Sequence, residues 1–308
     1  TASSYVFKTI DVQLGEFDTS FIPISGPDID STTYWGEVIN INYNYSWSYD
    51  TDSGPITGAT IFYELKSIDN PSKGVLNSGY MDTTGNPGIY NLTFNSTDLE
   101  FGLDTNENFR IDFEAEASGF SPRTATTLFE ISDIPTTLTL EKNTIDVYWL
   151  DNFTARVFLN DTFNEKPITD CNILFNGKES GIDHLQGMLL PEAQNPGWYN
   201  LTLNSTSFGD IGVYTLVINA SKTHYENHEN EELVINVFEI ETSYSLDKNS
   251  IKTFWNQNIT LEFTFRDEHN NIPIVDGVVT YQLPQLGGLM GNLTHDSSNP
   301  GTYRLELN

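Results

Sequence analysis

The tripeptide Asn-Pro-Gly occurs three times in this chain, beginning at Asn86, Asn195 and Asn299. Each time a tyrosine follows two residues after the glycine, and the copies are 109 and 104 residues apart. Two further landmarks keep nearly the same step, namely a tryptophan and a Pro-Ile pair, at Trp35, Trp149 and Trp255 and at Pro55, Pro167 and Pro273. A chain that repeats itself about every 106 residues folds as an array of like domains, and such arrays more often space or assemble than catalyse.

The second and third copies align directly. Residues 134–170 match residues 240–276 at a fixed offset of 106, without gaps and with 14 identities in 37 positions. Chance would not also keep the tryptophan, the proline and the Asn-Pro-Gly turn in order across three copies. The predicted domains are therefore 18–132, 133–239 and 240–308.

Both margins of the chain fall inside a repeat. Residues 15–21 match 238–244, which form the junction between the second and third copies. Residues 1–17 are therefore predicted to be the terminal strand of a preceding repeat. The third repeat has no counterpart of residues 205–239, so we expect it to lack its last strands within this chain.

Short runs of alternating apolar and polar residues predict strands rather than helices. Tyr90, Leu92 and Phe94 alternate with asparagine and threonine, which places the two kinds of side chain on opposite faces of a strand. One buried and one wet face is typical of an antiparallel sheet in a sandwich. The Asn-Pro-Gly before this run predicts a tight turn, in which proline fixes φ and glycine takes a positive φ.

Two equivalent segments carry a resemblance to a known family. Residues 55–63 read Pro-Ile-Thr-Gly-Ala-Thr-Ile-Phe-Tyr and residues 167–175 read Pro-Ile-Thr-Asp-Cys-Asn-Ile-Leu-Phe. They resemble a strand of bacterial immunoglobulin-like domains of the invasin and adhesin kind, and Asp210, Gly212 and Tyr214 are spaced as near an immunoglobulin tyrosine corner. The unit is similar to tandem repeats of large archaeal cell-surface proteins, including surface-layer proteins. The resemblance implies an all-β fold of tandem immunoglobulin-like β-sandwich domains and extracellular display.

The charge and cysteine content narrow the choice of partners. The net charge of −29, from 14 basic and 43 acidic residues, excludes nucleic acid, because phosphate binding needs clustered Lys and Arg. No stretch approaches the roughly 18 apolar residues of a membrane span.

Cys171 is the only cysteine, so no intrachain disulfide forms, and we expect it to pack as a small residue against the opposite sheet. An extracellular protein without disulfides fits a prokaryotic surface.

These features together predict a non-enzymatic structural protein of a prokaryotic, archaeal surface layer or surface filament, which assembles with like subunits. Two alternatives stay open. The domains can be the stalk of an adhesin that spaces a distant binding domain, or a carbohydrate-binding module. The latter rests on Trp47 and Tyr49, which extend past the common core pattern and offer an aromatic platform for sugar rings.

Strand exchange between subunits is one route to such assembly. Residues 4–14 of one copy would enter the incomplete third domain of a neighbour, and head-to-tail addition of this kind generates open filaments. The candidate donor positions are Val6, Ile10, Val12 and Leu14.

Asn-x-Ser/Thr sequons are the most specific functional signal, and they predict attached glycans. The pairs Asn91 with Asn95 and Asn200 with Asn204 lie on the predicted outward face of equivalent strands. The ten candidate asparagines are Asn44, Asn91, Asn95, Asn152, Asn160, Asn200, Asn204, Asn219, Asn258 and Asn292.

Calcium is the one cofactor with any support, because acidic residues recur in equivalent loops and calcium takes six to eight oxygen ligands. The weak candidates are Asp50, Asp52, Asp161, Asp170, Asp267 and Asp276. No calcium-loop motif follows Asp50, so ordinary solvated acids are the simpler interpretation.

His224, Glu226 and His228 would share a face if their segment is extended, and two histidines with a carboxylate can bind zinc. We expect an exposed polar edge there instead.

Overall fold

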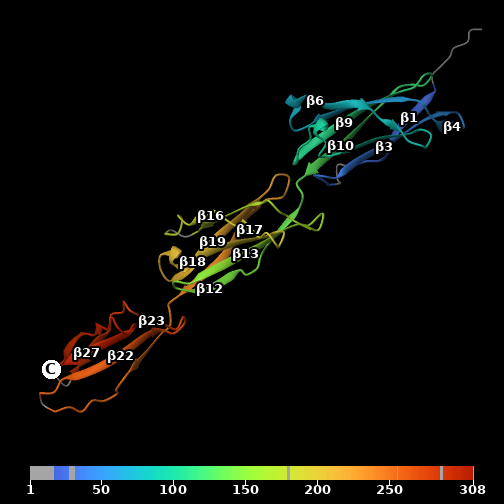
Figure 1. Cartoon of the computed structure of the whole chain (residues 1–308). Coiled ribbons are helices and arrows are strands. Elements are labelled where there is room, and N and C mark those ends of the chain that lie inside the picture. Colours follow the sequence, from blue (N-terminus) through green and yellow to red (C-terminus); the bar gives the residue numbers. More distant parts are fainter. Residues whose placement is uncertain (1–16, 28–31, 179–180, 255, 285–286, 308) are drawn as a thin grey trace, which may run out of the picture. The chain divides into compact units, whose positions relative to one another are not determined.

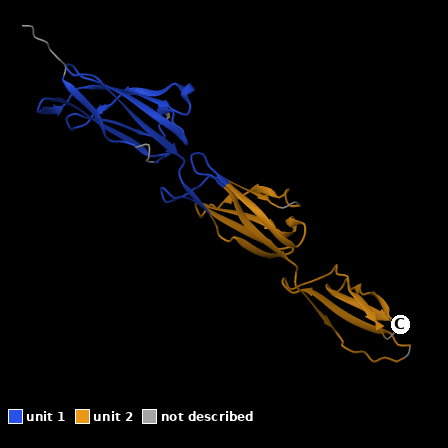
Figure 2. Cartoon of the chain, turned by 180° about the vertical axis from the view of Figure 1, so that it is seen from behind, with its two compact units in different colours: residues 1–138, 159–171, 220–228 blue, residues 139–158, 172–219, 229–308 orange. Residues whose placement is uncertain are grey.

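The computed structural model describes residues 17–27, 32–178, 181–254, 256–284 and 287–307 (Figure 1). Apart from three short 3-10 turns, all its regular structure is β (Figure 1). Within these residues no helix has the length and apolar character to cross a membrane. Two compact units are distinguished in Figure 2. Unit 1 joins residues 1–138, 159–171 and 220–228, and unit 2 joins residues 139–158, 172–219 and 229–308.

The first repeat is a two-sheet sandwich. One sheet has the order β1-β3-β8-β7 with β4 as a hairpin on β3, and the other has the order β2-β10-β9-β5-β6. Only β2 runs parallel to its neighbour, β10. This strand order is that of an immunoglobulin-like sandwich. The bounds are β1 (Asp18–Ser25), β2 (Thr33–Tyr34), β3 (Val38–Tyr49), β4 (Asp52–Pro55), β5 (Thr60–Ser67), η1 (Pro71–Lys73), β6 (Val75–Tyr80), β7 (Asp82–Thr83), β8 (Ile89–Asn95), η2 (Leu99–Phe101), β9 (Glu107–Glu116) and β10 (Arg123–Ser132).

The second repeat has the same topology. Its sheets have the orders β11-β13-β18-β17, with β14 on β13, and β12-β20-β19-β15-β16. The strand β12 again runs parallel to β20. The bounds are β11 (Thr136–Leu140), β12 (Thr144–Tyr148), β13 (Asn152–Asp161), β14 (Lys166–Pro167), β15 (Asn172–Gly177), β16 (Gln186–Met188), β17 (Leu190–Pro191), β18 (Trp198–Asn204), η3 (Ser205–Phe208), β19 (Gly212–Ser221) and β20 (His228–Phe238).

The third repeat has one complete sheet, β21-β22-β27-β26 with β23 on β22, and the pair β24-β25. Its described residues contain no counterpart of β9 and β10. As a result, Leu261 and Phe263 of the inner face are only half-buried. The bounds are β21 (Thr242–Leu246), β22 (Ile259–Asp267), β23 (Ile272–Pro273), β24 (Thr280–Leu283), β25 (Leu289–Asn292), β26 (Thr294–His295) and β27 (Thr302–Leu307).

The predicted alternation of faces is confirmed. Along β8, Tyr90, Leu92 and Phe94 are buried while the residues between them are partly or fully exposed. Along β9, Phe113 and Ala115 are buried, whereas Asp112, Glu114 and Glu116 beside them are partly or fully exposed. The buried faces of the two sheets meet in one core in the first sandwich.

The Asn-Pro-Gly turns are built alike in all three repeats. Their glycines, Gly88, Gly197 and Gly301, have φ of 77°, 82° and 78°. In each turn the N–H of the residue after the glycine donates to the asparagine carbonyl, at 3.0–3.1 Å. A Cβ on Gly88 would lie 2.7 Å from Cβ of Pro55, and one on Gly301 would lie 2.6 Å from Cβ of Pro273. The repeated glycine and the repeated Pro-Ile pair are therefore parts of one packed corner.

The tyrosine after the first and third turns holds the loop that follows the Pro-Ile pair, where the chain crosses to the other sheet. The hydroxyl of Tyr90 donates to the carbonyl of Ile56 at 3.0 Å and accepts from the N–H of Ala59 at 2.9 Å. Tyr303 makes the same pair of bonds with Ile274 and Gly277. The landmarks that define the repeat are thus structural requirements of the sandwich.

Candidate functional site

The sequon asparagines lie at the surface, and none of the ten is buried. Asn91 and Asn200 project from the outward faces of β8 and β18. Asn91 donates to the side-chain oxygens of Asn40 and Asn42 on β3, so a ladder of asparagines covers this face. Whether any of the ten carries a glycan stays a prediction.

Two of these asparagines have a structural role in equivalent places. The side-chain oxygen of Asn95 accepts from the N–H and hydroxyl of Thr97, while its amide donates to the carbonyl of Gly36 at 3.1 Å. Asn204 binds Thr206 in the same way and donates to the carbonyl of Leu150 at 2.9 Å. The repeated Asn-Ser-Thr therefore ties the end of a strand to the loop after the landmark tryptophan. A sugar on either amide would compete with this bond.

The outward face of the second sandwich carries an ion-pair network instead of an asparagine ladder. Arg156 binds both oxygens of Glu192 at 2.7 and 2.9 Å, and a third nitrogen lies 2.7 Å from Glu141. The Arg156 guanidinium and then Asn195 lower the pKa of Glu192 to about 2. Arg156 also lies over the ring of Trp198, 4.5 Å from its centroid. This network holds the side chains of that face in place, and the carboxylates of Glu192 and Glu141 are already bonded to Arg156.

The calcium candidates fall into two groups. Asp161 and Asp267 are buried, and each accepts from the N–H and amide of an asparagine three residues later, Asn164 and Asn270. Burial raises the pKa of Asp267, but the bonds from Asn270 outweigh it and leave that pKa below its usual range. These two carboxylates close a hairpin turn. Asp50, Asp52, Asp170 and Asp276 are exposed loop or hairpin residues.

No group of three or more His, Cys, Asp or Glu placed to hold one metal ion occurs in the described part of the chain. The zinc alternative also fails on geometry, because the segment is not extended at His224, where φ is +66°. His228 Nε2 instead lies 2.8 Å from the hydroxyl of Thr136, whose main-chain N–H contacts the carboxylate of Glu226 at 3.3 Å. Cys171 is buried as predicted, with its Sγ 3.2 Å from the carbonyl of Ser221.

An aromatic contact recurs in the two units. Inside unit 1, Tyr34 packs on Phe163 of the β13–β14 hairpin, with ring centroids 4.8 Å apart. Inside unit 2, Tyr148 packs on His269 of the β22–β23 hairpin at 4.0 Å. Each tyrosine directly precedes a landmark tryptophan, and Phe163 and His269 are 106 residues apart, so the two contacts are equivalent. The repeats therefore share a tyrosine-on-hairpin contact as well as a fold.

Near each of these contacts a histidine lies beside an aspartate. The ring of His224 stacks on Trp35 at 3.8 Å, and its Nδ1 lies 3.8 Å from the carboxylate of Asp104. His269 Nε2 lies 2.9 Å from the carboxylate of Asp151. Sequence reasoning missed both pairs, because residues that are distant in sequence meet there.

Trp47 and Tyr49 belong to an aromatic cluster. Phe17 lies 5.3 Å from Trp47, 6.0 Å from Tyr49 and 5.8 Å from Phe120, measured between ring centroids. Trp47 is half-buried and packs against Gly54, whereas Tyr49 is 67 % exposed. Tyr49 and Phe17 are thus the most exposed members of this cluster.

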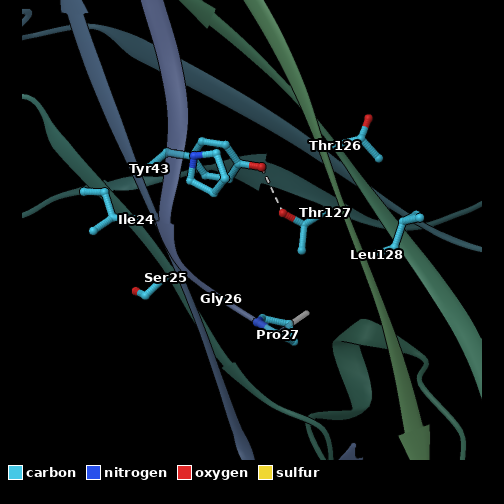
Figure 3. A pocket seen from close by; sticks show the side chains of 9 residues that line it. Ile24, Ser25, Gly26, Pro27, Tyr43, Thr126, Thr127 and Leu128 are labelled. Atoms are coloured by element: carbon cyan, nitrogen blue, oxygen red, sulfur yellow. Dashed lines mark hydrogen bonds between the residues drawn. The ribbon is translucent and has the colours of Figure 1, made fainter. Parts of the chain in front are cut away.

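A cavity of about 440 Å³ lies beside the bulge at the end of β1, and Figure 3 shows its lining side chains. Its wall includes Ile24, Pro27 and Leu128, and the hydroxyls of Tyr43 and Thr127 are bonded to each other at 2.9 Å (Figure 3). Burial raises the pKa of the Tyr43 phenol, although the bond with Thr127 opposes this. The polar side chains of the lining are hydroxyls, and none is a carboxylate, amine, imidazole or thiol.

No protein-family model matches the chain, and no curated protein matches it. Solved structures similar to it include the I9–I11 tandem of titin, with 12 % identity over 94 % of this chain and 89 % of the other and a TM-score of 0.30. The fibronectin(III)-like modules of Clostridium thermocellum CbhA show 15 % identity over 71 % and 95 % with a TM-score of 0.25. Similarity at such scores carries no argument. The assignment of tandem immunoglobulin-like sandwiches rests on the strand order described above.

Proposed function

We propose that this chain is a non-enzymatic structural protein displayed outside the cell, as part of an archaeal surface layer or surface filament. The observation that carries the proposal is repetition of the contact as well as of the fold. The Tyr34–Phe163 and Tyr148–His269 contacts use the same positions of the repeat. An array whose repeats share both a fold and a contact surface is suited to setting distances, because each repeat is added in the same way.

The surface chemistry supports extracellular display. A net charge of −29 keeps the outer faces hydrated and mutually repelling, and divalent cations such as calcium would relieve that repulsion between neighbouring copies. Exposed sequons on outward strand faces provide places for glycans. Asn44, Asn258 and Asn292 are the favoured sites, because none is tied into a loop in the way that Asn95 and Asn204 are.

Strand exchange remains the proposed route of assembly. The donor residues Val6, Ile10, Val12 and Leu14 lie outside the described residues. The acceptor would be the open third sandwich, where Tyr281 and Leu283 of β24 and Leu261 and Phe263 of β22 are only half-buried. A chain with residues 1–14 deleted should fail to form fibres, and normal fibres from it would rule out strand exchange.

An adhesin stalk is the second candidate, since a spacer uses the same repetition. A carbohydrate-binding module is less well supported, because Trp47 packs against Phe17 and Gly54 and does not present an open ring face.

Immunogold electron microscopy of intact source cells, with antibodies to the recombinant chain, separates the first two candidates. Regular label in a lattice or along fibres supports the layer or filament, isolated label far from the envelope supports the stalk, and label confined to the cytoplasm refutes both.

A further inference from the structure

The tyrosine-on-hairpin contact has an equivalent position in the first sandwich. In each repeat a β hairpin pairs the proline of the Pro-Ile motif with a residue on the preceding strand, namely Ser46, Asn160 or Arg266. Three residues beyond this partner lie Tyr49, Phe163 and His269. Phe163 and His269 contact a tyrosine that precedes a landmark tryptophan. Tyr49 occupies the same register and is 67 % exposed.

Tyr49 is backed by a prepared apolar surface. Phe17, 41 % exposed, meets its ring nearly edge-on, with an interplanar angle of 87°. Phe120 packs beneath Phe17 and is itself only half-buried. Large aromatic side chains gathered at one solvent-facing place are typical of contact surfaces, because their burial stabilises association.

The third repeat contains the other half of the contact. Phe254 stands 106 residues after Tyr148 and directly before the landmark Trp255, so it occupies the position of the contacting tyrosine. Its side chain is 80 % exposed, among the highest values for a large apolar residue in the described part of the chain. The chain therefore presents one exposed hairpin aromatic and one exposed counterpart to it.

We propose that Phe17, Tyr49 and Phe120 form a docking surface for Phe254 of a second copy of this chain. Two observations favour Phe254 as the occupant. The two equivalent contacts inside the units pair the same positions of the repeat, and the charges beside Tyr49 and Phe254 are opposite. Asp50 and Asp52 flank Tyr49, while the exposed Lys252 stands two residues before Phe254. Such an interface is heterologous, so one copy adds to the next in an open series.

The docking deepens the proposed function, on which it rests, by naming a surface through which copies assemble. The test is sedimentation velocity of the full chain over a range of concentrations. It is run at about 0.15 and 0.5 M salt, because the strongly acidic copies repel one another and salt screens that repulsion. The wild-type chain should form a concentration-dependent series. Tyr49→Ala and Phe254→Ala should each weaken association at least tenfold, and Tyr80→Ala, which alters a tyrosine 65 % exposed on β6, should not.

Mixing the two variants provides the decisive arm. Tyr49→Ala keeps Phe254 and Phe254→Ala keeps Tyr49, so a mixture should form dimers that cannot extend further. A wild-type chain that stays monomeric at all concentrations, or a mixture that gives no dimers, overturns the proposal. Association that is lost on deletion of residues 1–14 but kept in Tyr49→Ala assigns assembly to strand exchange. Loss of glycan-array binding in Tyr49→Ala with unchanged sedimentation assigns the surface to sugars.

The two proposals can fail separately. Immunogold labelling reports where the chain is displayed and does not depend on Tyr49. Monomeric behaviour in the centrifuge would remove the docking surface and leave a surface-displayed spacer in place.

Discussion

Replacing Tyr90 by phenylalanine removes one oxygen and leaves the ring in the core. Tyr90 is 1 % exposed, and its hydroxyl serves the carbonyl of Ile56 and the N–H of Ala59 at 3.0 and 2.9 Å. Leaving a buried polar group without its partner costs about 1–3 kcal/mol. Two groups lose a partner here, but Ala59 lies at a partly accessible loop where water can replace the hydroxyl. We therefore expect Tyr90→Phe to destabilise the first sandwich by about 2 kcal/mol, which is about a 30-fold change in its opening equilibrium.

Hydrogen exchange followed by mass spectrometry measures this change repeat by repeat within one molecule. The slowest amides of β3 and β9 should exchange about 30-fold faster in the variant, because they exchange through opening of the sandwich. Amides of β22 in the third repeat should be unchanged and are an internal control. Tyr80→Phe, at an exposed position, is the matched substitution. A change below about 0.5 kcal/mol in the first sandwich, or an equal change in Tyr80→Phe, would refute the role assigned to the hydroxyl.

Three further outcomes are expected. Gly88→Ala should destabilise the first sandwich by at least about 2 kcal/mol more than Gly58→Ala. Both glycines have a positive φ, but only Gly88 has backbone and proline atoms within 3 Å of an added Cβ, and equal shifts in melting temperature would contradict this reasoning. Because the folded pKa of Glu192 is about 2, its contribution to stability is present above about pH 4.5 and is lost as the pH falls toward 2. The free energies of unfolding of the wild type and Glu192→Gln should therefore converge over that window in acid denaturation curves. Excess EDTA should leave melting unchanged, since Asn164 and Asn270 already hold the carboxylates of Asp161 and Asp267, and a loss that calcium reverses would establish a site.

The sequence predicted those features that depend on local chemistry. The turn glycines have the positive φ that Asn-Pro-Gly requires. The spacing of Asp210 and Tyr214 predicted a tyrosine corner, and the hydroxyl of Tyr214 does donate to the carbonyl of Asp210, at 3.0 Å. The longer aromatic alternation in the first repeat is also real, because β3 has 12 residues where β13 has 10. Such patterns can be read from sequence because each is fixed by a few neighbouring residues.

Features that depend on distant residues were not predictable in this way. The side chain of His224 was placed on one face with His228, but a positive φ turns it toward Trp35. Asp161 was considered as a cation ligand, yet it is bonded to Asn164 within a turn. Tyr49 and Phe163 stand 114 residues apart, as do Trp35 and Trp149, but nothing in the sequence indicated that this position contacts another sandwich.

Repeated and varied residues occupy different places in the sandwiches. The glycine, tyrosine and proline that recur in all three copies hold one corner together in the first and third sandwiches, and a residue used in this way is not free to serve a partner. Variation concentrates at the hairpin tip, where Tyr49, Phe163 and His269 replace one another. The same holds for the outward sheet face, which carries asparagines in one copy and an Arg156 network in the next. The fold tolerates these exchanges, and in the second and third repeats the residue at the hairpin tip contacts a tyrosine of another sandwich.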